Sequence, residues 1–180
     1  MFKYKIDINE NNWMQYIDGW SIFTDIRKDA RRMGIKFEKS TCKFRLYDNT
    51  KFQLCETYPA YLIVPATLSD EHIIACSKFR TKNRLPALSY YHKANGVSMW
   101  RSSQNMNGVL NYRSMEDEIM ITEIGKTANR SSNMINNSRV IIYDARPKLN
   151  AQGNKFKGGG FEDLKNYKNC DLIFCDIDRI

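Results

Sequence analysis

The sequence predicts an α/β fold with a mixed, largely parallel sheet flanked by helices. Segments with apolar residues at helical spacing alternate along the chain with short apolar runs that are typical of buried strands. The clearest of these runs, VIIY at residues 140–143, is followed by a loop rich in Asn, Lys and Gly. In open α/β sheets, a loop at the carboxyl edge of a strand is the usual place for a ligand.

Length and composition agree with a single globular domain. The 180 residues are enough for one core, and 42% of them are hydrophobic. No apolar run approaches the ~18 residues of a membrane span, and the N-terminus lacks the order of a signal peptide, so we expect a cytoplasmic protein. The five cysteines are an odd number without paired ligand spacing, which predicts reduced thiols and no metal site. No cofactor is expected. Four cysteines are expected to be buried: Cys55, Cys76, Cys170 and Cys175.

The chain is basic, with a net charge of +8 from 28 basic and 20 acidic residues. This balance favours polyanionic partners, which include nucleic acid, anionic lipid headgroups and phosphorylated substrates. The sequence contains no zinc finger, no RNP-type aromatic strand and no recognisable helix-turn-helix, so nucleic acid is not expected as a partner.

Residues 1–19 are polar and are predicted to form an N-terminal arm. The first helix is expected over residues 21–33, with Gly34 as its stop signal. Residues 42–46 and 51–57 resemble two strands joined by a turn, which predicts a hairpin. One face of the first helix is basic, which suits either solvent or a membrane surface. Its basic residues are Arg27, Lys28, Arg31 and Arg32.

Residues 60–64 form another apolar run, which Pro65 ends. The next helix is predicted to begin at Ser69 or Asp70, because either residue suits the N-cap position, and to end near Arg80.

Two more strands and a helix follow. The strands are predicted at residues 85–91 and 97–100, on either side of a turn. Ser114 then caps a helix with acidic residues in its first turn and an apolar stripe that runs to about Ala128. Residues 129–138 are polar and predict a linker.

The loop after the clearest strand ends in the glycine triplet 158–160. Its donors and positive charge indicate an anionic ligand, and the alternative is a solvated surface loop. Asp144 and Arg146 are expected to form an ion pair that shapes the strand end. Residues 162–168 are predicted to form a short helix, and residues 172–177 a buried strand. The donor residues of the loop are Asn150, Asn154, Lys155 and Lys157.

Seven segments of the sequence are distinctive. In order, they read LCETYPAYLIVP, FRTKNRLPALSYYH, RSSQ, EDE, IYDARP, NAQGNKFKGGGFE and NYKNCDLIFCDI. Their order and spacing resemble the first part of the myotubularin phosphatase domain, over residues 13–180. The resemblance implies that residues 20–180 are part of such a domain. Myotubularins are cysteine-dependent phosphatases that remove the 3-phosphate from phosphatidylinositol 3-phosphate and phosphatidylinositol 3,5-bisphosphate.

The family's nucleophile lies in a loop similar to HCSDGWDRT, in which five residues separate a Cys from an Arg. The Cys thiolate and the Arg cradle the phosphate. No Cys of this sequence is followed by an Arg at that spacing, so we expect a domain truncated before the catalytic loop, without a catalytic residue. The family's lipid-binding PH-GRAM module and coiled coil are also expected to be absent. Residues 172–177 would then expose apolar surface.

The resemblance also implies which residues contact a phosphoinositide. Asn154 matches a family residue that contacts the lipid, and Lys157 belongs to the same basic loop. Arg179 replaces a contacting Asn of the family, and Ile180 matches the Ile that follows it. Asn105 is a second departure, because the family usually has Pro after RSSQ.

Three interpretations of function remain open. The first is an inactive family member or fragment, a pseudophosphatase. The second is the N-terminal portion of an active phosphoinositide 3-phosphatase. The third is a binding or adaptor module that holds phosphoinositide headgroups on membranes or associates with an active myotubularin. The expected location is the cytoplasm, with a peripheral position on endosomal membranes.

Overall fold

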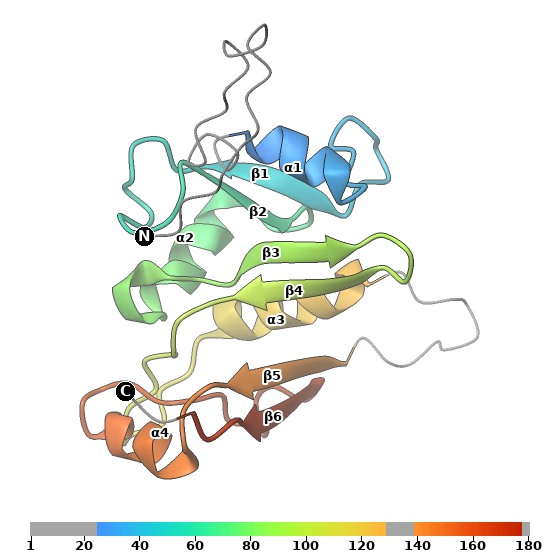
Figure 1. Ribbon diagram of the computed structural model, residues 1–180. Coiled ribbons are helices and arrows are strands. Elements are labelled where there is room, and N and C mark those ends of the chain that lie inside the picture. The colour runs from blue at the N-terminus through green and yellow to red at the C-terminus, as the bar shows by residue number, and fades with distance from the viewer. Residues whose placement is uncertain (1–24, 129–138, 178–180) are drawn as a thin grey trace, which may run out of the picture.

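The computed structural model describes residues 25–128 and 139–177, and Figure 1 shows three strand pairs arranged one below the other. Helices α2 and α3 pack against each other, and α3 contacts both β2 and β5. None of the helices in the described residues is long and apolar enough to span a bilayer. In chain order, the elements are α1 (Ile26–Arg32), β1 (Phe44–Asp48), β2 (Tyr61–Pro65), α2 (Asp70–Lys78), the 3-10 turn η3 (Thr81–Asn83), β3 (Ala87–His92), β4 (Val97–Arg101), α3 (Met115–Thr127), β5 (Val140–Asp144), α4 (Lys148–Lys155) and β6 (Cys170–Phe174).

The strand pairs confirm a mixed α/β fold but not a largely parallel sheet. The β1–β2 and β3–β4 pairs are antiparallel, and only the β5–β6 pair of the described residues is parallel. The connections explain this difference. Residues 93–96 join β3 to β4 and are long enough for a hairpin only, whereas residues 145–169 provide the crossover that a parallel pair needs.

The hairpin predicted between residues 42–46 and 51–57 is wrong, because β1 pairs with β2 instead. The side chain of Asn49, which is 2% exposed, holds the intervening residues in a loop. Its amide nitrogen donates to the carbonyl oxygens of Cys55 at 2.9 Å and Pro59 at 3.0 Å. Its oxygen accepts from the backbone N–H of Cys55 at 3.3 Å. A strand at residues 51–57 would lose these buried hydrogen bonds.

Helix α1 agrees with the predicted helix over the part that the structure describes. Asp25 caps it by accepting from the backbone N–H groups of Arg27 and Lys28. Gly34 follows the helix with a φ of 87°, a conformation that favours glycine. The four basic side chains of α1 are exposed, as predicted for a solvated face. Residues 21–24 and the predicted arm 1–19 lie outside the described residues.

The caps predicted for α2 and α3 are confirmed. The Ser69 hydroxyl accepts from the backbone N–H of His72 at 3.3 Å, and the Ser114 hydroxyl accepts from that of Asp117 at 3.2 Å. The two helices, β2, the start of β6 and the segments between elements together form the main core. Its buried residues are Leu54, Leu62, Val64, Leu68, Ile73, Cys76, Leu85, Met120, Ile121, Ile124, Tyr167 and Cys170. A second cluster packs α1 against β1 and β3.

The predictions for the C-terminal part need three corrections. Residues 148–155 form α4, where a loop was expected. The helix forms here because Pro147 suits the start of a helix and Ala151, one of its own residues, is fully buried. Residues 162–168 form turns in place of the predicted helix. The predicted strand at residues 172–177 is shifted, since β6 is Cys170–Phe174.

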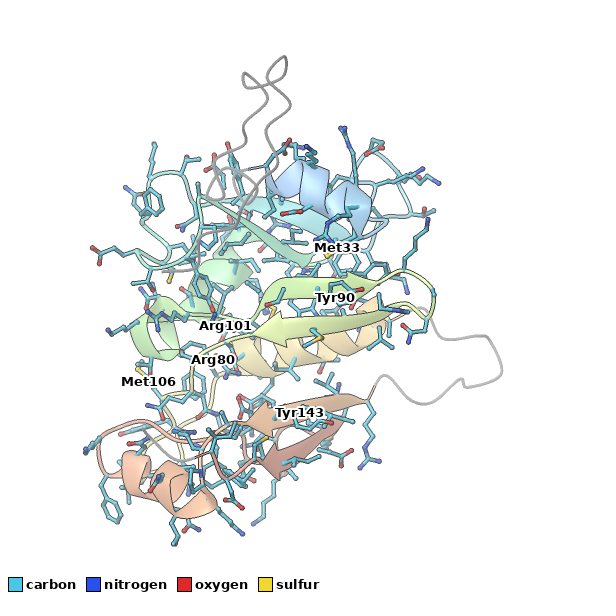
Figure 2. All side chains as sticks on the ribbon, in the orientation of Figure 1. Met33, Arg80, Tyr90, Arg101, Met106 and Tyr143 are labelled. Carbon is cyan, nitrogen blue, oxygen red and sulfur yellow. The ribbon has the colours of Figure 1, made fainter. Side chains whose placement is uncertain are left out.

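The β5–β6 pair exposes apolar side chains, as expected. Ile141 is 50% exposed, Tyr143 65%, Ile173 44% and Ile177 64%. Tyr143 projects from β5 in Figure 2.

Candidate functional site

The end of β5 is fixed by the predicted ion pair between Asp144 and Arg146, with 2.6 Å between Oδ2 and Nη2. Arg146 also donates to the carbonyl oxygen of Gly160 at 2.9 Å and to the side-chain oxygen of Gln104. Burial would raise the pKa of Asp144, but hydrogen bonds from Arg146 outweigh this effect and hold the pKa below its usual value. Arg146 therefore ties the strand end to two segments that are distant in the sequence.

Helix α4 ends in a tight turn, residues 154–160, which we call the α4 turn. The carbonyl oxygen of Asn154 accepts from the backbone N–H groups of Lys157 and Gly159, each at 3.0 Å. Lys155 lies 4.6 Å above the ring of Phe161 and donates to Asn111 at 2.9 Å. Lys157 is exposed and forms no ion pair with the residues that the structure describes. The turn therefore brings the half-buried Asn154 next to a free cation.

The glycine triplet is required by both conformation and space. Gly158 has a φ of +81°. A Cβ at Gly159 would lie 2.5 Å from the amide nitrogen of Gln104, and one at Gly160 would lie 1.7 Å from Oδ1 of Asn107. Residues 104–108 thus pack directly on the backbone of the α4 turn and fix its position.

A buried ionic cluster centred on Arg80, which Figure 2 labels, adjoins this region through Glu162. Arg80 is 1% exposed and binds Asp117 through two hydrogen bonds, at 2.7 and 2.6 Å. Its second charged partner is Glu162, at 2.6 Å. The hydroxyl of Tyr167 donates to Asp117 at 2.6 Å. The cluster joins α2, α3 and the segment after the glycine triplet.

The charges of this cluster support each other. Burial alone would lower the pKa of Arg80, but the carboxylates of Asp117 and Glu162 outweigh it and hold the pKa well above its usual value. Burial raises the pKa of Tyr167, and the charge of Asp117 raises it further. Arg80 therefore stays charged and Tyr167 stays protonated near neutral pH, which suits a structural role better than proton transfer.

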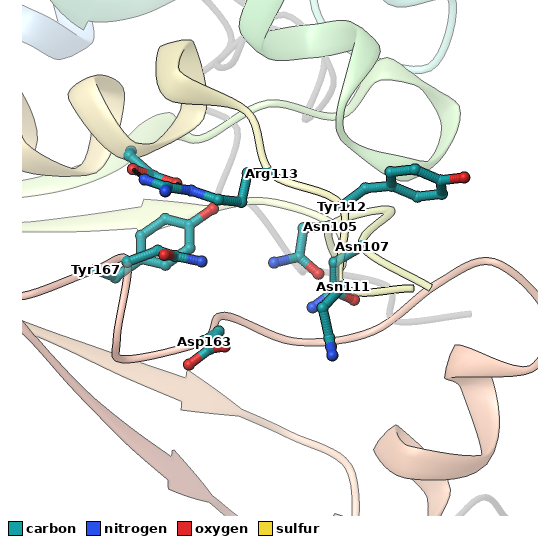
Figure 3. A pocket seen from close by; sticks show the side chains of 9 residues that line it. Asn105, Asn107, Asn111, Tyr112, Arg113, Asp163 and Tyr167 are labelled. Carbon is teal, nitrogen blue, oxygen red and sulfur yellow. Dashed lines mark hydrogen bonds and ion pairs between the residues drawn. The ribbon is translucent and has the colours of Figure 1, made fainter. Parts of the chain in front are cut away.

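A small polar pocket lies between residues 105–113 and residues 163–167, and Figure 3 shows it from close by. Asn105 is 1% exposed and Asn107 3%, and the side-chain oxygens of both are buried without a partner among the described residues. The amide nitrogen of Asn107 donates to the carbonyl oxygen of Phe161 at 2.8 Å. The lining residues are Asn105, Asn107, Asn111, Tyr112, Arg113, Glu118, Asp163, Asn166 and Tyr167.

Two buried cysteines, Cys76 and Cys170, lie in surroundings that do not favour a thiolate. Cys76 donates to Asp117 at 3.3 Å, and burial raises its pKa well above the usual range. Burial also raises the pKa of Cys170 to about 12. Cys55 is buried as predicted, but Cys175 is exposed, which corrects the prediction for that residue. The described residues contain no group of three or more His, Cys, Asp or Glu side chains that could hold a metal ion.

Comparison with known proteins identifies the family. The model of the myotubularin-like phosphatase domain matches residues 1–180. The chain belongs to this family. It is 38% identical over 180 residues to phosphatidylinositol-3,5-bisphosphate 3-phosphatase of Bos taurus. This alignment covers 99% of this chain and 25% of that protein. It is 36% identical over 173 residues to myotubularin of Rattus norvegicus, and this alignment covers 96% of this chain and 27% of the rat protein. A phosphoinositide 3-phosphatase of Saccharomyces cerevisiae is 39% identical over 152 residues, and this alignment covers 83% of this chain and 22% of the yeast protein. The chain thus spans about a quarter of the length of these relatives.

Two of the four contact residues predicted for this myotubularin-like chain lie in the described part. Asn154 and Lys157 are brought together by the α4 turn. Neither residue lines the polar pocket, which adjoins the turn through Asn111. Arg179 and Ile180 lie outside the described residues. The contact of all four residues with a lipid stays a prediction.

Sequence reasoning missed the residues that support the myotubularin-like site. Arg80, Asp117, Glu162 and Tyr167 form the buried cluster, and Gln104 packs on the α4 turn. Each of them belongs to a segment that carries the family resemblance. A charged residue within such a segment is the signal that could have indicated a buried ionic partner.

Proposed function

We propose that this chain binds phosphoinositide headgroups at the α4 turn and that its 180 residues do not hydrolyse them. The observation that carries the proposal is the position of Lys157. This free cation lies on a turn that Gln104 and Asn107 hold in place, and the backbone N–H of Lys157 donates to the carbonyl oxygen of Asn154. A cation and an amide donor on a fixed backbone suit a phosphate group. The relatives from Bos taurus and Saccharomyces cerevisiae are named as phosphoinositide phosphatases, which agrees with this ligand class.

Binding at this position is expected to be weak and sensitive to salt. The α4 turn lies at the carboxyl end of a helix, where the helix dipole repels an anion. The lysine side chains must overcome this repulsion, and salt screens their attraction. Lys155 contributes less than Lys157, because it is already bound to Asn111 and Phe161.

The absence of hydrolysis is proposed from the cysteines. Cysteine-dependent phosphatases need a thiolate, and the pKa values of the buried Cys76 and Cys170 are raised. At the spacing of the family's catalytic loop, Cys42, Cys55, Cys76 and Cys170 are followed by Asp, Tyr, Lys and Asp in place of Arg.

The second candidate function is phosphoinositide 3-phosphatase activity in which a further segment supplies the nucleophile. The length of the relatives favours it, because this chain matches about a quarter of them.

Vesicles that carry phosphatidylinositol 3-phosphate test binding and hydrolysis together. The purified chain is expected to sediment with the vesicles, to dissociate as salt rises, and to release no phosphate above a blank. Lys155→Ala combined with Lys157→Ala should reduce retention. The matched control is Lys36→Ala with Lys39→Ala, two exposed lysines that follow α1, and it should not. Phosphate release would contradict the proposed inactivity, and unchanged retention in the first variant would exclude the α4 turn.

We further propose a peripheral position on the cytoplasmic face of endosomal membranes, supported by the net charge of +8. A fluorescent fusion should lose this position on Lys155→Ala with Lys157→Ala. Association with an active myotubularin stays a prediction, which co-purification with such a relative would test.

A further inference from the structure

The most exposed large apolar side chains of the described residues lie in two segments. They are Phe156 at 83%, Leu149 at 79% and Leu110 at 73%. Leu149 and Phe156 are seven residues apart and therefore project from the same face of α4 and its turn. Leu110 follows Val109, which is 56% exposed, in the turn between β4 and α3. Exposed apolar side chains that gather in this way mark an interaction surface.

These two segments lie side by side. The backbone N–H of Gly108 donates to the carbonyl oxygen of Gly159 at 3.0 Å, and Lys155 donates to the side chain of Asn111 at 2.9 Å. Figure 1 likewise places the connection between β4 and α3 next to α4. The exposed side chains therefore come from two segments that are joined to each other by hydrogen bonds.

The surroundings of this surface are basic. Residues 106–115 and 145–161 contain no Asp or Glu and five basic residues. Arg113 and Arg146 are paired with carboxylates. Lys148, Lys155 and Lys157 form no ion pair with the described residues, so no carboxylate there neutralises their charge, although Lys155 is held by Asn111 and Phe161.

This composition distinguishes a bilayer from a protein partner. Lysine is depleted in protein–protein interfaces, whereas exposed Leu and Phe side chains bordered by Lys are typical of surfaces that enter an anionic membrane interface. Each lysine near such a membrane adds to the attraction, and the apolar side chains gain by leaving water.

We propose that Val109, Leu110, Leu149 and Phe156 form an insertion surface that enters the headgroup and upper acyl region of an anionic bilayer. Lys148, Lys155 and Lys157 then lie at the level of the headgroups. The inference rests on the proposed function and extends it, because the α4 turn would present Asn154 and Lys157 to a phosphoinositide in that same bilayer.

Co-sedimentation with vesicles tests the insertion surface. The variant Leu149→Ser with Phe156→Ser should bind phosphatidylcholine–phosphatidylserine vesicles about tenfold less tightly than the unchanged chain, because it loses two large apolar groups. The matched control is Val97→Ser with Met99→Ser, which changes two apolar side chains on β4 that are 47% and 63% exposed. The control should bind within about twofold of the unchanged chain.

A second variant keeps the surface apolar and reports its depth. The Phe156→Trp variant should be quenched by brominated lipid more strongly than the unchanged chain, whose three native tryptophans give the background, whereas the Met99→Trp variant should not. Equal quenching of both, or vesicle binding that Leu149→Ser with Phe156→Ser leaves unchanged, would overturn the proposal. So would a lipid-free dimer that these substitutions dissociate, because the surface would then bind a second copy of the chain.

A soluble phosphatidylinositol 3-phosphate headgroup separates this inference from the proposed function. The Leu149→Ser with Phe156→Ser variant should bind this headgroup as the unchanged chain does. If the unchanged chain binds vesicles but not the headgroup, the insertion surface stands and the proposed function fails. If it binds the headgroup and shows no effect of the serine substitutions on vesicles, the insertion surface fails.

Discussion

Single side chains hold the α4 turn against the rest of the domain. Asn107 and Gln104 fill the space that a Cβ would need at Gly160 and Gly159, so these glycines are fixed by packing. A Cβ at Gly153, which lies within α4, would have nothing within 4 Å. The two kinds of glycine allow a matched comparison.

Gly160→Ala is expected to lower the free energy of unfolding by about 1–3 kcal/mol, because the new methyl group forces Asn107 and the turn apart. It should also weaken headgroup retention. Gly153→Ala should instead stabilise the chain by about 0.5–1 kcal/mol, since alanine favours the helix. Urea denaturation measures both changes. Equal stability of the two variants would show that the turn is not fixed by this packing.

Asp117→Asn tests the buried ionic cluster. Removing this charge leaves Arg80 with Glu162 as its one charged partner, and breaking a buried pair costs about 3–5 kcal/mol of unfolding free energy. The control is Asp171→Asn, which removes the exposed ion pair with Arg139 and should leave the urea midpoint unchanged. Similar midpoints for the two variants would mean that the cluster contributes little.

Sequence separation explains which side-chain pairs could be predicted. Asp144 and Arg146 are two residues apart at the end of a clear strand, and their ion pair was predicted and is confirmed. Arg80 is 37 residues from Asp117 and 82 from Glu162. No local pattern places these three side chains together, so the cluster depends on how the helices pack.

Among the secondary-structure elements, local sequence signals predicted the capped helices correctly. They failed where buried side chains determine whether a segment forms a helix, a strand or a loop. The N-caps of α2 and α3 follow from Ser69 and Ser114. The Asn- and Gly-rich composition of residues 148–155 predicted a loop, yet burial of Ala151 stabilises α4 there. The expected hairpin failed because the buried side chain of Asn49 holds the chain in a loop.

The ion pair at the end of β5 makes this element sensitive to acid. The pKa of Asp144 is lower in the folded chain than its usual value, so its contribution to stability is complete above the unfolded pKa, about 4, and is lost as pH falls through the folded value. The difference in urea midpoint between the unchanged chain and Asp144→Asn should therefore shrink from pH 5 toward about pH 2. A difference that stays constant over this range would contradict the role of the Asp144 charge.

At the scale of the whole molecule, five of the seven segments that carry the family resemblance meet in one region. The DARP arginine contacts the RSSQ glutamine and the glycine triplet, while the EDE segment and the residues after the triplet share Arg80. The family was therefore predictable from the sequence. The strand pairing could not be predicted, because the periodicity of a segment does not show which other strand it pairs with.

The exposed apolar face of β5–β6 is expected to promote aggregation of the isolated chain in solution. Ile141→Thr with Ile173→Thr should reduce aggregation, because both side chains are about half exposed and threonine keeps the β-branched shape. Light scattering during heating measures the effect. An unchanged onset of aggregation would indicate that another surface drives association.

Headgroup binding at the α4 turn is tested most directly by titrating the isotope-labelled chain with soluble, short-chain phosphatidylinositol 3-phosphate in NMR spectra. Saturable shifts are expected at the side-chain amide of Asn154 and the backbone amides of residues 157–160, and Lys157→Ala should weaken them. The ligand should remain intact during the titration. Shifts confined to the basic face of α1 or to the polar pocket, or conversion of the ligand with release of phosphate, would contradict a binding site at the α4 turn that does not catalyse.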